Sequence, residues 1–181
     1  MPVRSIMLLG DPGLYYVSAP VERQELEAMR AVVGDLHDTL VDFRRRHGVG
    51  RAIAAPQIGV WKRLIYMHTG ESVAFLNPSL SRESTEMMEV WDDCMSFPDL
   101  LVKVLRHHHC RIEYRDLDWK ERSLDLEGDL SELLQHECDH LEGILAVMRA
   151  IDGRSFALRQ ATEAKRQSRA LASQRTQRAR A

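Results

Sequence analysis

The chain carries the segment His136-Glu137-Cys138-Asp139-His140, which combines two histidines and a glutamate in the pattern HExxH. On a helix, residues four apart lie on one face, so both histidines can reach the same metal ion. Glu137 lies beside them and can take and deliver a proton. The pattern also arises by chance on surface helices. The leucines around it favour a buried helix, in which ionisable side chains need a partner such as a metal.

A third candidate ligand, Cys94, lies 42 residues before His136. Zinc and ferrous iron both accept imidazole nitrogen and thiolate sulfur in tetrahedral sites. Two histidines and one cysteine leave a fourth position for water, whose pKa a metal ion lowers to about 7. The hydroxide could then attack a carbonyl, so these residues indicate a hydrolase. Cys138 points to another side of the helix and is expected in the core, while Asp139 either orients a neighbouring side chain or faces solvent.

The composition is that of a soluble globular protein, with 181 residues, 44% hydrophobic and 29% charged. This length favours one domain with a sizeable core. No apolar run reaches the roughly 18 residues of a membrane span, and the N-terminal apolar run is too short for a signal peptide. Three cysteines in such a chain argue against a disulfide framework. We therefore expect a cytoplasmic protein that does not bind membranes.

The charge is unevenly distributed along the chain. The formal net charge is -2, yet residues 154–181 contain eight Lys or Arg and one Glu. We expect these residues to form a basic C-terminal helix or tail. Such a segment either holds a polyanion such as ribosomal RNA or is a solvated helix end.

The hydrophobic pattern predicts an α+β fold. Apolar residues recur at helical spacing over residues 22–46, and Gly48 is a helix stop signal. A second helix is expected to open at Asp129 with a capping box to Glu132, and a last helix near Asp152. Strands are expected at residues 62–67, 73–76, 101–105, 110–114 and 123–126. Short hairpins rather than regular βαβ units favour antiparallel or mixed sheets.

Three segments together resemble the peptide deformylase family, whose members remove the N-formyl group from newly made polypeptides. Residues 135–143 match the family pattern QHExDHLxG throughout, and residues 50–57 stand where the family has GxGxAAPQ. Asp92-Asp93-Cys94-Met95-Ser96 stands where the family has EGCLS. The resemblance spans roughly residues 5–150. It implies a catalytic domain over residues 1–153, with sheets around a central HExxH helix, followed by the basic segment.

The resemblance also implies the roles of the site residues. Cys94, His136 and His140 would hold one divalent metal ion, Fe²⁺ in the native enzyme, which Zn²⁺ or Ni²⁺ can replace. Glu137 would be the general acid and base, and the substrates would be N-formylmethionyl peptides. The Gln57 side-chain amide and the Met95 backbone N–H would stabilise the oxyanion, a role in which fixed donors are worth ~3 kcal/mol each.

The chain departs from the family pattern beside the cysteine. Asp92 stands where the family has a structural glutamate, and Asp93 stands where a glycine lines the substrate cleft. Ala52 replaces the second glycine of the first motif. A Cβ at either glycine position can disturb close approach of a substrate. These departures affect the expected substrate range but no metal ligand.

Three further residues are candidates for substrate binding. Arg106 is expected either to bind the peptide or to anchor Asp92. The resemblance implies a pocket for the methionine side chain, with Ile53 and Leu133 as candidate walls and plain core packing as the alternative. The histidines at 107–109 suggest a second metal site, although a loop or strand edge is the simpler interpretation.

Three other functions remain open at this point. A hydrolase of another N-formyl amide or small formylated metabolite would share the same metal and glutamate. A non-catalytic paralogue would bind metal or peptide without turnover. A general zincin protease needs a downstream third ligand, for which residues 141–150 offer only Glu142.

Overall fold

A computed structural model describes residues 2–161 of the chain. The long α-helices are α1 (Leu26–His47) and α2 (Asp129–Leu141), and residues 159–161 are also helical. The strands are β1 (Ala52–Ala54), β2 (Leu64–His68), β3 (Ser72–Ser81), β4 (Met87–Asp93), β5 (Leu100–His107), β6 (His109–Arg115), β7 (Glu121–Glu127) and β8 (Phe156–Leu158). Short 3₁₀ helices occur at Pro12–Tyr15, Arg23–Glu25, Ala55–Ile58 and Ala146–Arg149.

The strands form two antiparallel sheets, which confirms the α+β class. One sheet has the order β1-β2-β3-β6-β7 and the other β4-β5-β8. The expected hairpin is β2–β3, in which Ile65 pairs with Phe75. β1 and β4 are edge strands of their sheets, so each leaves one row of backbone groups unpaired within its sheet.

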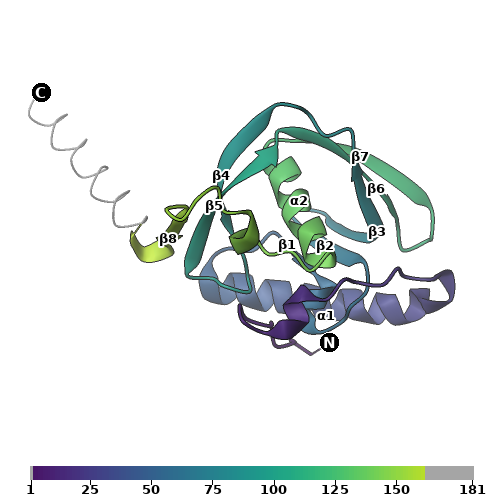
Figure 1. Cartoon of the computed structure of the whole chain (residues 1–181). Helices are drawn as coiled ribbons and strands as arrows, with labels where there is room; N and C mark the ends of the chain where they lie inside the picture. The colour runs from purple at the N-terminus through teal and green to yellow at the C-terminus, as the bar shows by residue number, and fades with distance from the viewer. Residues whose placement is uncertain (1, 162–181) are drawn as a thin grey trace, which may run out of the picture.

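Helix α2 packs against strands of both sheets, among them β1, β5 and β7. Figure 1 shows it enclosed by the strands, with α1 running below. Every residue from 133 to 141 is buried. A helix that is buried all round carries its polar side chains into the interior, where they need partners. The polar groups of the HExxH segment are therefore inside the protein.

The predicted amphipathic helix is confirmed as α1. Its buried face includes Leu36, Leu40 and Phe43, which join a core cluster with residues of β1–β3. Gly48 ends the helix with φ 72°, and its N–H donates to the Arg44 carbonyl. A left-handed φ at this position explains why a glycine stops the helix. In the described part of the chain, no helix is long and apolar enough to cross a membrane.

The helix expected to open at Asp129 is confirmed as α2, but its expected capping box and the expected start of the last helix near Asp152 are wrong. α2 is capped by Gly128 with φ 56° and has no side-chain cap, because Glu132 instead pairs with Arg51 at 2.9 Å. No helix begins at Asp152, whose Oδ1 accepts from the Arg154 N–H and from a serine hydroxyl in a turn. The chain then forms β8, which pairs with β5, and residues 159–161 after it are helical, so the last helix starts later than expected and the folded part continues past residue 153. The basic segment from 162 onward lies outside the described residues.

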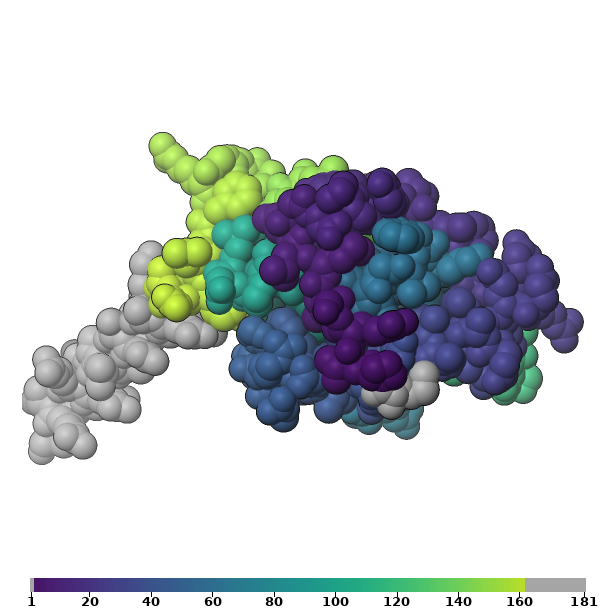
Figure 2. Space-filling model, turned by 90° about the horizontal axis from the view of Figure 1, so that it is seen from below, coloured from purple at the N-terminus to yellow at the C-terminus, as the bar shows by residue number. Residues whose placement is uncertain are grey.

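The N-terminal segment lies across one face of the molecule, as Figure 2 shows in purple. The Met7 N–H donates to the Gln57 carbonyl at 2.9 Å, and the Leu9 N–H donates to the Ser96 carbonyl at 2.9 Å. These bonds join the two segments that carry Gln57 and Cys94. The N-terminal segment thus helps to hold these two segments in place through backbone hydrogen bonds.

Gly143, in the turn after α2, allows the N-terminal segment to approach closely. Its φ is 69°, and a Cβ there would lie 2.6 Å from the Tyr15 carbonyl carbon. We expect Gly143→Ala to lower the free energy of unfolding by about 1–3 kcal/mol, because both backbone strain and a backbone clash oppose it. Gly153→Ala, where a Cβ would meet nothing within 4 Å, is the matched control. Urea unfolding of both variants checks this, and equal midpoints would contradict it.

Candidate metal and catalytic site

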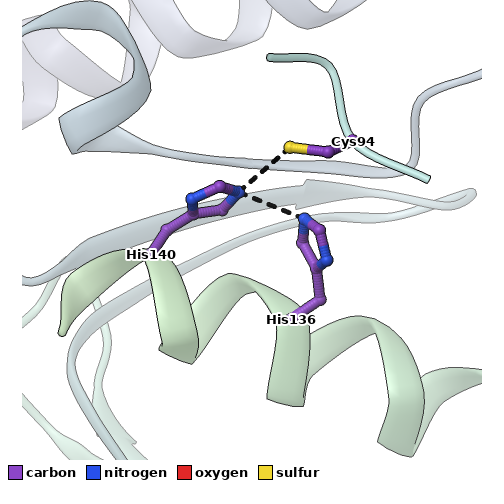
Figure 3. A group of neighbouring side chains, drawn as sticks. All are labelled: Cys94, His136 and His140. Carbon is purple, nitrogen blue, oxygen red and sulfur yellow. Dashed lines mark hydrogen bonds between the residues drawn. The ribbon is translucent and has the colours of Figure 1, made fainter. Parts of the chain in front are cut away.

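Cys94, His136 and His140 converge on one point, although they come from two segments of the chain. His136 and His140 point from the same face of α2 toward Cys94 (Figure 3). The His140 Nε2 lies 3.3 Å from the Cys94 Sγ and 3.1 Å from the His136 Nε2. All three residues are buried. Spacing on the helix accounts for the two histidines, and the turn after β4 supplies the cysteine.

The donor set fits a single metal ion. Ligand atoms about 2.0–2.3 Å from one tetrahedral ion lie roughly 3.3–3.7 Å apart, close to the observed separations. The other nitrogen of His136, Nδ1, lies 2.8 Å from Asp92 Oδ1. A carboxylate at this position fixes the imidazole so that Nε2 presents its lone pair to a metal.

Glu137 adjoins these ligands and is also buried, with 3% of its surface exposed. Its Oε2 has no hydrogen-bond partner among the described residues. Burial raises the pKa of Glu137 to about 7, and the neighbouring charges of Asp92 and Glu132 add to this while His136 opposes it. A carboxyl group with such a pKa can both accept and donate a proton near neutral pH.

Gln57 lies in the 3₁₀ helix after β1, with its side chain directed at the cysteine. Its Oε1 accepts from the Ala54 N–H at 3.0 Å, which fixes the amide orientation. Its Nε2 lies 3.2 Å from Ser96 Oγ and 3.6 Å from Cys94 Sγ. The Gln57 amide is therefore a fixed donor beside the candidate ligands, and Met95 lies on the same cavity wall.

A buried ionic network supports the ligands from the side away from the cavity. Arg106 donates from Nη2 to Asp92 at 2.8 Å and from Nη1 to Asp139 at 2.6 Å. Asp139 also accepts two bonds from Arg149. Burial alone would raise the pKa of Asp92, but His136 and Arg106 lower it to about 2. Arg106 thus anchors Asp92 and does not contact the cavity, so its alternative role in peptide binding is not supported.

A cavity of about 520 Å³ opens onto Cys94, His136 and Glu137. Ala52, Asp93 and Leu133 line it as expected. Ile53, expected as a pocket wall, is instead fully buried in the core cluster with α1. Successive strand residues face opposite sides, so Ala52 can face the cavity only if Ile53 faces the core.

The comparison with known proteins agrees with this geometry. The family model for polypeptide deformylase matches residues 3–155. The chain belongs to this family. A peptide deformylase of Rhizobium meliloti is 37% identical over 153 residues, which are 81% of this chain and 84% of the relative. Peptide deformylase 1 of Bordetella pertussis is 33% identical over 165 residues, covering 85% of this chain and 91% of the relative.

Solved structures of deformylases share the fold. The crystal structure of the Thermotoga maritima enzyme has a TM-score of 0.76 at 27% identity, covering 84% of this chain and 100% of that chain. The structure of a Legionella pneumophila peptide deformylase has a TM-score of 0.75 at 32% identity, covering 82% and 86%. As a peptide deformylase, this protein is a metal-dependent hydrolase that removes the N-formyl group from newly made polypeptides.

Two ion pairs line the cavity of this deformylase, and no sequence pattern predicted either of them. Arg51 pairs with Glu132 at 2.9 Å, and Arg159 pairs with Asp93 at 2.6 Å. The members of each pair are 81 and 66 residues apart in the chain. No local pattern in the sequence could have matched them.

Cys110, Cys138 and the histidines at 107–109 do not line the deformylase cavity. Cys138 and Cys110 belong to one apolar core cluster, which confirms their expected core positions. Burial raises the pKa of the Cys138 thiol to about 12. His107 Nδ1 lies 2.7 Å from the Ser84 carbonyl oxygen, and its backbone is held by the Gln135 side chain.

Proposed function

We propose that Cys94, His136 and His140 hold the catalytic metal ion and that Glu137 moves the protons of formyl hydrolysis. The observation that carries this proposal is the convergence of three buried ligand atoms beside the buried Glu137, whose Oε2 has no hydrogen-bond partner in the described part of the chain. A Cys-His-His set accepts ferrous iron or zinc, and the family resemblance favours Fe²⁺, with Zn²⁺ or Ni²⁺ as substitutes. Helix α2 is then the central element that positions two ligands and the proton carrier.

Different residues of the chain would carry out proton transfer and stabilise the developing negative charge. The bound metal would supply a Lewis acid and an activated water. Glu137 would accept a proton from the attacking water and deliver it to the amide nitrogen that leaves. The Gln57 amide and the Met95 N–H would donate to the formyl oxygen as it gains negative charge.

The peptide substrate would lie between two edge strands. Ala52 begins β1, Asp93 ends β4, and both line the cavity. An extended peptide can pair with the free backbone groups of an edge strand. Leu133, with apolar neighbours Phe43 and Met95, would receive the methionine side chain.

An assay of formate release tests this function. Protein purified without oxygen and loaded with Fe²⁺ is given formyl-Met-Ala-Ser, with formyl-Met alone in parallel. Faster release from the tripeptide is the expected result for an enzyme of nascent chains. Because Asp93 and Ala52 both add side chains to the cavity, hydrolysis of another formyl amide is the second candidate. Preference for a small formyl amide over the tripeptide would favour it.

Gln57→Leu should lower kcat by about 10²–10³-fold with a smaller change in KM, because the lost donor acts on charge that develops in the transition state. Steady-state kinetics with formyl-Met-Ala-Ser measure this. Ser96→Ala, which removes only the acceptor of the second Gln57 N–H bond, should cost less. Unchanged kcat in the Gln57 variant would remove this residue from the proposed mechanism.

We also propose that the basic C-terminal segment contacts the ribosome of the cytoplasm in which this enzyme would act. Its support is the excess of Lys and Arg after residue 153. Contacts of Lys and Arg with phosphates weaken steeply as salt rises. Sedimentation with ribosomes should therefore depend on salt and be lost when residues 162–181 are deleted, whereas equal sedimentation would refute the contact.

A further inference from the structure

An ion pair on the cavity wall joins the end of the described chain to the ligand-bearing turn. Arg159 follows β8 directly, and its Nη2 donates to Asp93 Oδ2 at 2.6 Å. Its Nε donates to the Pro98 carbonyl at 2.9 Å. Both members of the pair line the cavity, with side chains 23% and 39% exposed for Arg159 and Asp93. A substrate in the cavity would therefore meet this pair.

The backbone fixes Arg159 in this position. Its N–H donates to the Asp99 carbonyl at 2.9 Å. One residue earlier, Leu158 pairs with Leu100 in the β5–β8 ladder. Arg159 therefore contacts Asp93 before the turn and Pro98 and Asp99 at its other end. This turn, residues 94–99, includes Cys94 and Met95. The backbone of Arg159 is fixed, and its guanidinium donates to two acceptors. Such a side chain loses little conformational freedom when it forms an ion pair.

The pair compensates a charge that Asp93 would otherwise place in the cavity. Asp93 is the last residue of edge strand β4 and directly precedes Cys94. In the proposed pairing, the peptide residues after the formylmethionine would extend past Asp93, away from the metal site. The other cavity cations are already engaged: Arg44 donates to two backbone carbonyls, and Arg51 pairs with Glu132. Arg159 is consequently the residue that neutralises Asp93.

We propose that Arg159 and Asp93 form a charge-compensated subsite that determines which residues after the formylmethionine are accepted. The inference rests on the proposed function and names the substrate preference of the same cavity. With the pair intact, peptides with Lys or Glu after methionine are accepted about equally. With one member removed, the remaining charge selects the peptide of opposite charge.

Three variants separate this specificity role from a structural one. Arg159→Ala exposes the Asp93 carboxylate, so the ratio of kcat/KM for formyl-Met-Lys-Ser over formyl-Met-Glu-Ser should rise roughly fivefold, the effect of one partly exposed charge. Asp93→Asn, nearly equal in shape, should shift the ratio the other way. The double variant should return it to the wild-type value. The shifts should lie in KM rather than kcat.

Affinity of the deformylated products gives a second readout that needs no turnover. Calorimetric Kd values of Met-Lys-Ser and Met-Glu-Ser should show the same opposite shifts in the two single variants. Lys103→Ala is the matched control, since Lys103 pairs with Glu89 at 2.9 Å on the same sheet but outside the cavity lining. It should leave the ratio unchanged.

The outcomes are distinct. Unchanged ratios in both single variants, or an equal loss for all peptides, would overturn the subsite. Failure of the wild-type protein to release formate from any peptide would refute the proposed function instead, and the product affinities would still test the charge preference.

Discussion

Glu137→Gln is expected to lower kcat for formyl-Met-Ala-Ser by about 10²–10⁴-fold, the usual contribution of a positioned acid and base. The substitution preserves the size of a side chain that is 3% exposed, so the core should tolerate it. It removes a carboxyl group beside the ligands whose pKa, raised to about 7 by burial, suits two-way proton transfer. Kinetics of formate release on metal-loaded protein measure the loss.

The metal content of the variant distinguishes proton transfer from metal loss. Glu137 is not among the three grouped ligand residues, so one metal ion per chain should be retained. Glu142→Gln is the matched control, because Glu142 caps the same helix and pairs with Arg63 at the surface. It should keep activity within about threefold, as expected for an exposed pair. Full activity in Glu137→Gln would exclude the proton-transfer role.

The two histidine ligands could be predicted from the sequence because helical spacing is a local property. His136 and His140 share a face wherever the HExxH segment is helical, and α1 and the β2–β3 hairpin likewise follow from local patterns. The chemistry of its thiol made Cys94 a candidate, and the family resemblance supported the choice, since no local rule joins the turn after β4 to α2. The geometry shows these three together in the interior.

Local patterns failed where a residue's surroundings come from distant segments. Ile53 and Ala52 are both buried, and only the fold decides which of them faces the cavity. Glu132 has capping-box spacing, but Arg51, just before β1, pairs with its carboxylate instead. The helix expected near Asp152 begins only at residue 159, because residues 156–158 first pair with the free edge of β5 as β8. The partners of Glu132 and of β8 lie more than 40 residues away in the chain.

Arg106→Met is expected to lower the free energy of unfolding by about 3–5 kcal/mol, because it leaves Asp92 and Asp139 buried without their shared cation. Arg106 is 2% exposed and donates to both carboxylates. Urea unfolding measures the change. Arg111→Met removes a two-bond pair with Asp125 whose carboxylate is 74% exposed, and it should cost less than about 1 kcal/mol.

The same substitution should also weaken metal binding. Asp92 lies 2.8 Å from His136 Nδ1, so loss of its anchor loosens the orientation of a ligand. Loss of such supporting contacts lowers metal affinity about 10–100-fold. Competition with a chelator, performed where the variant is still folded, measures this separately from stability. A variant that unfolds early but binds metal as tightly as wild type would show that Arg106 stabilises the core without positioning His136.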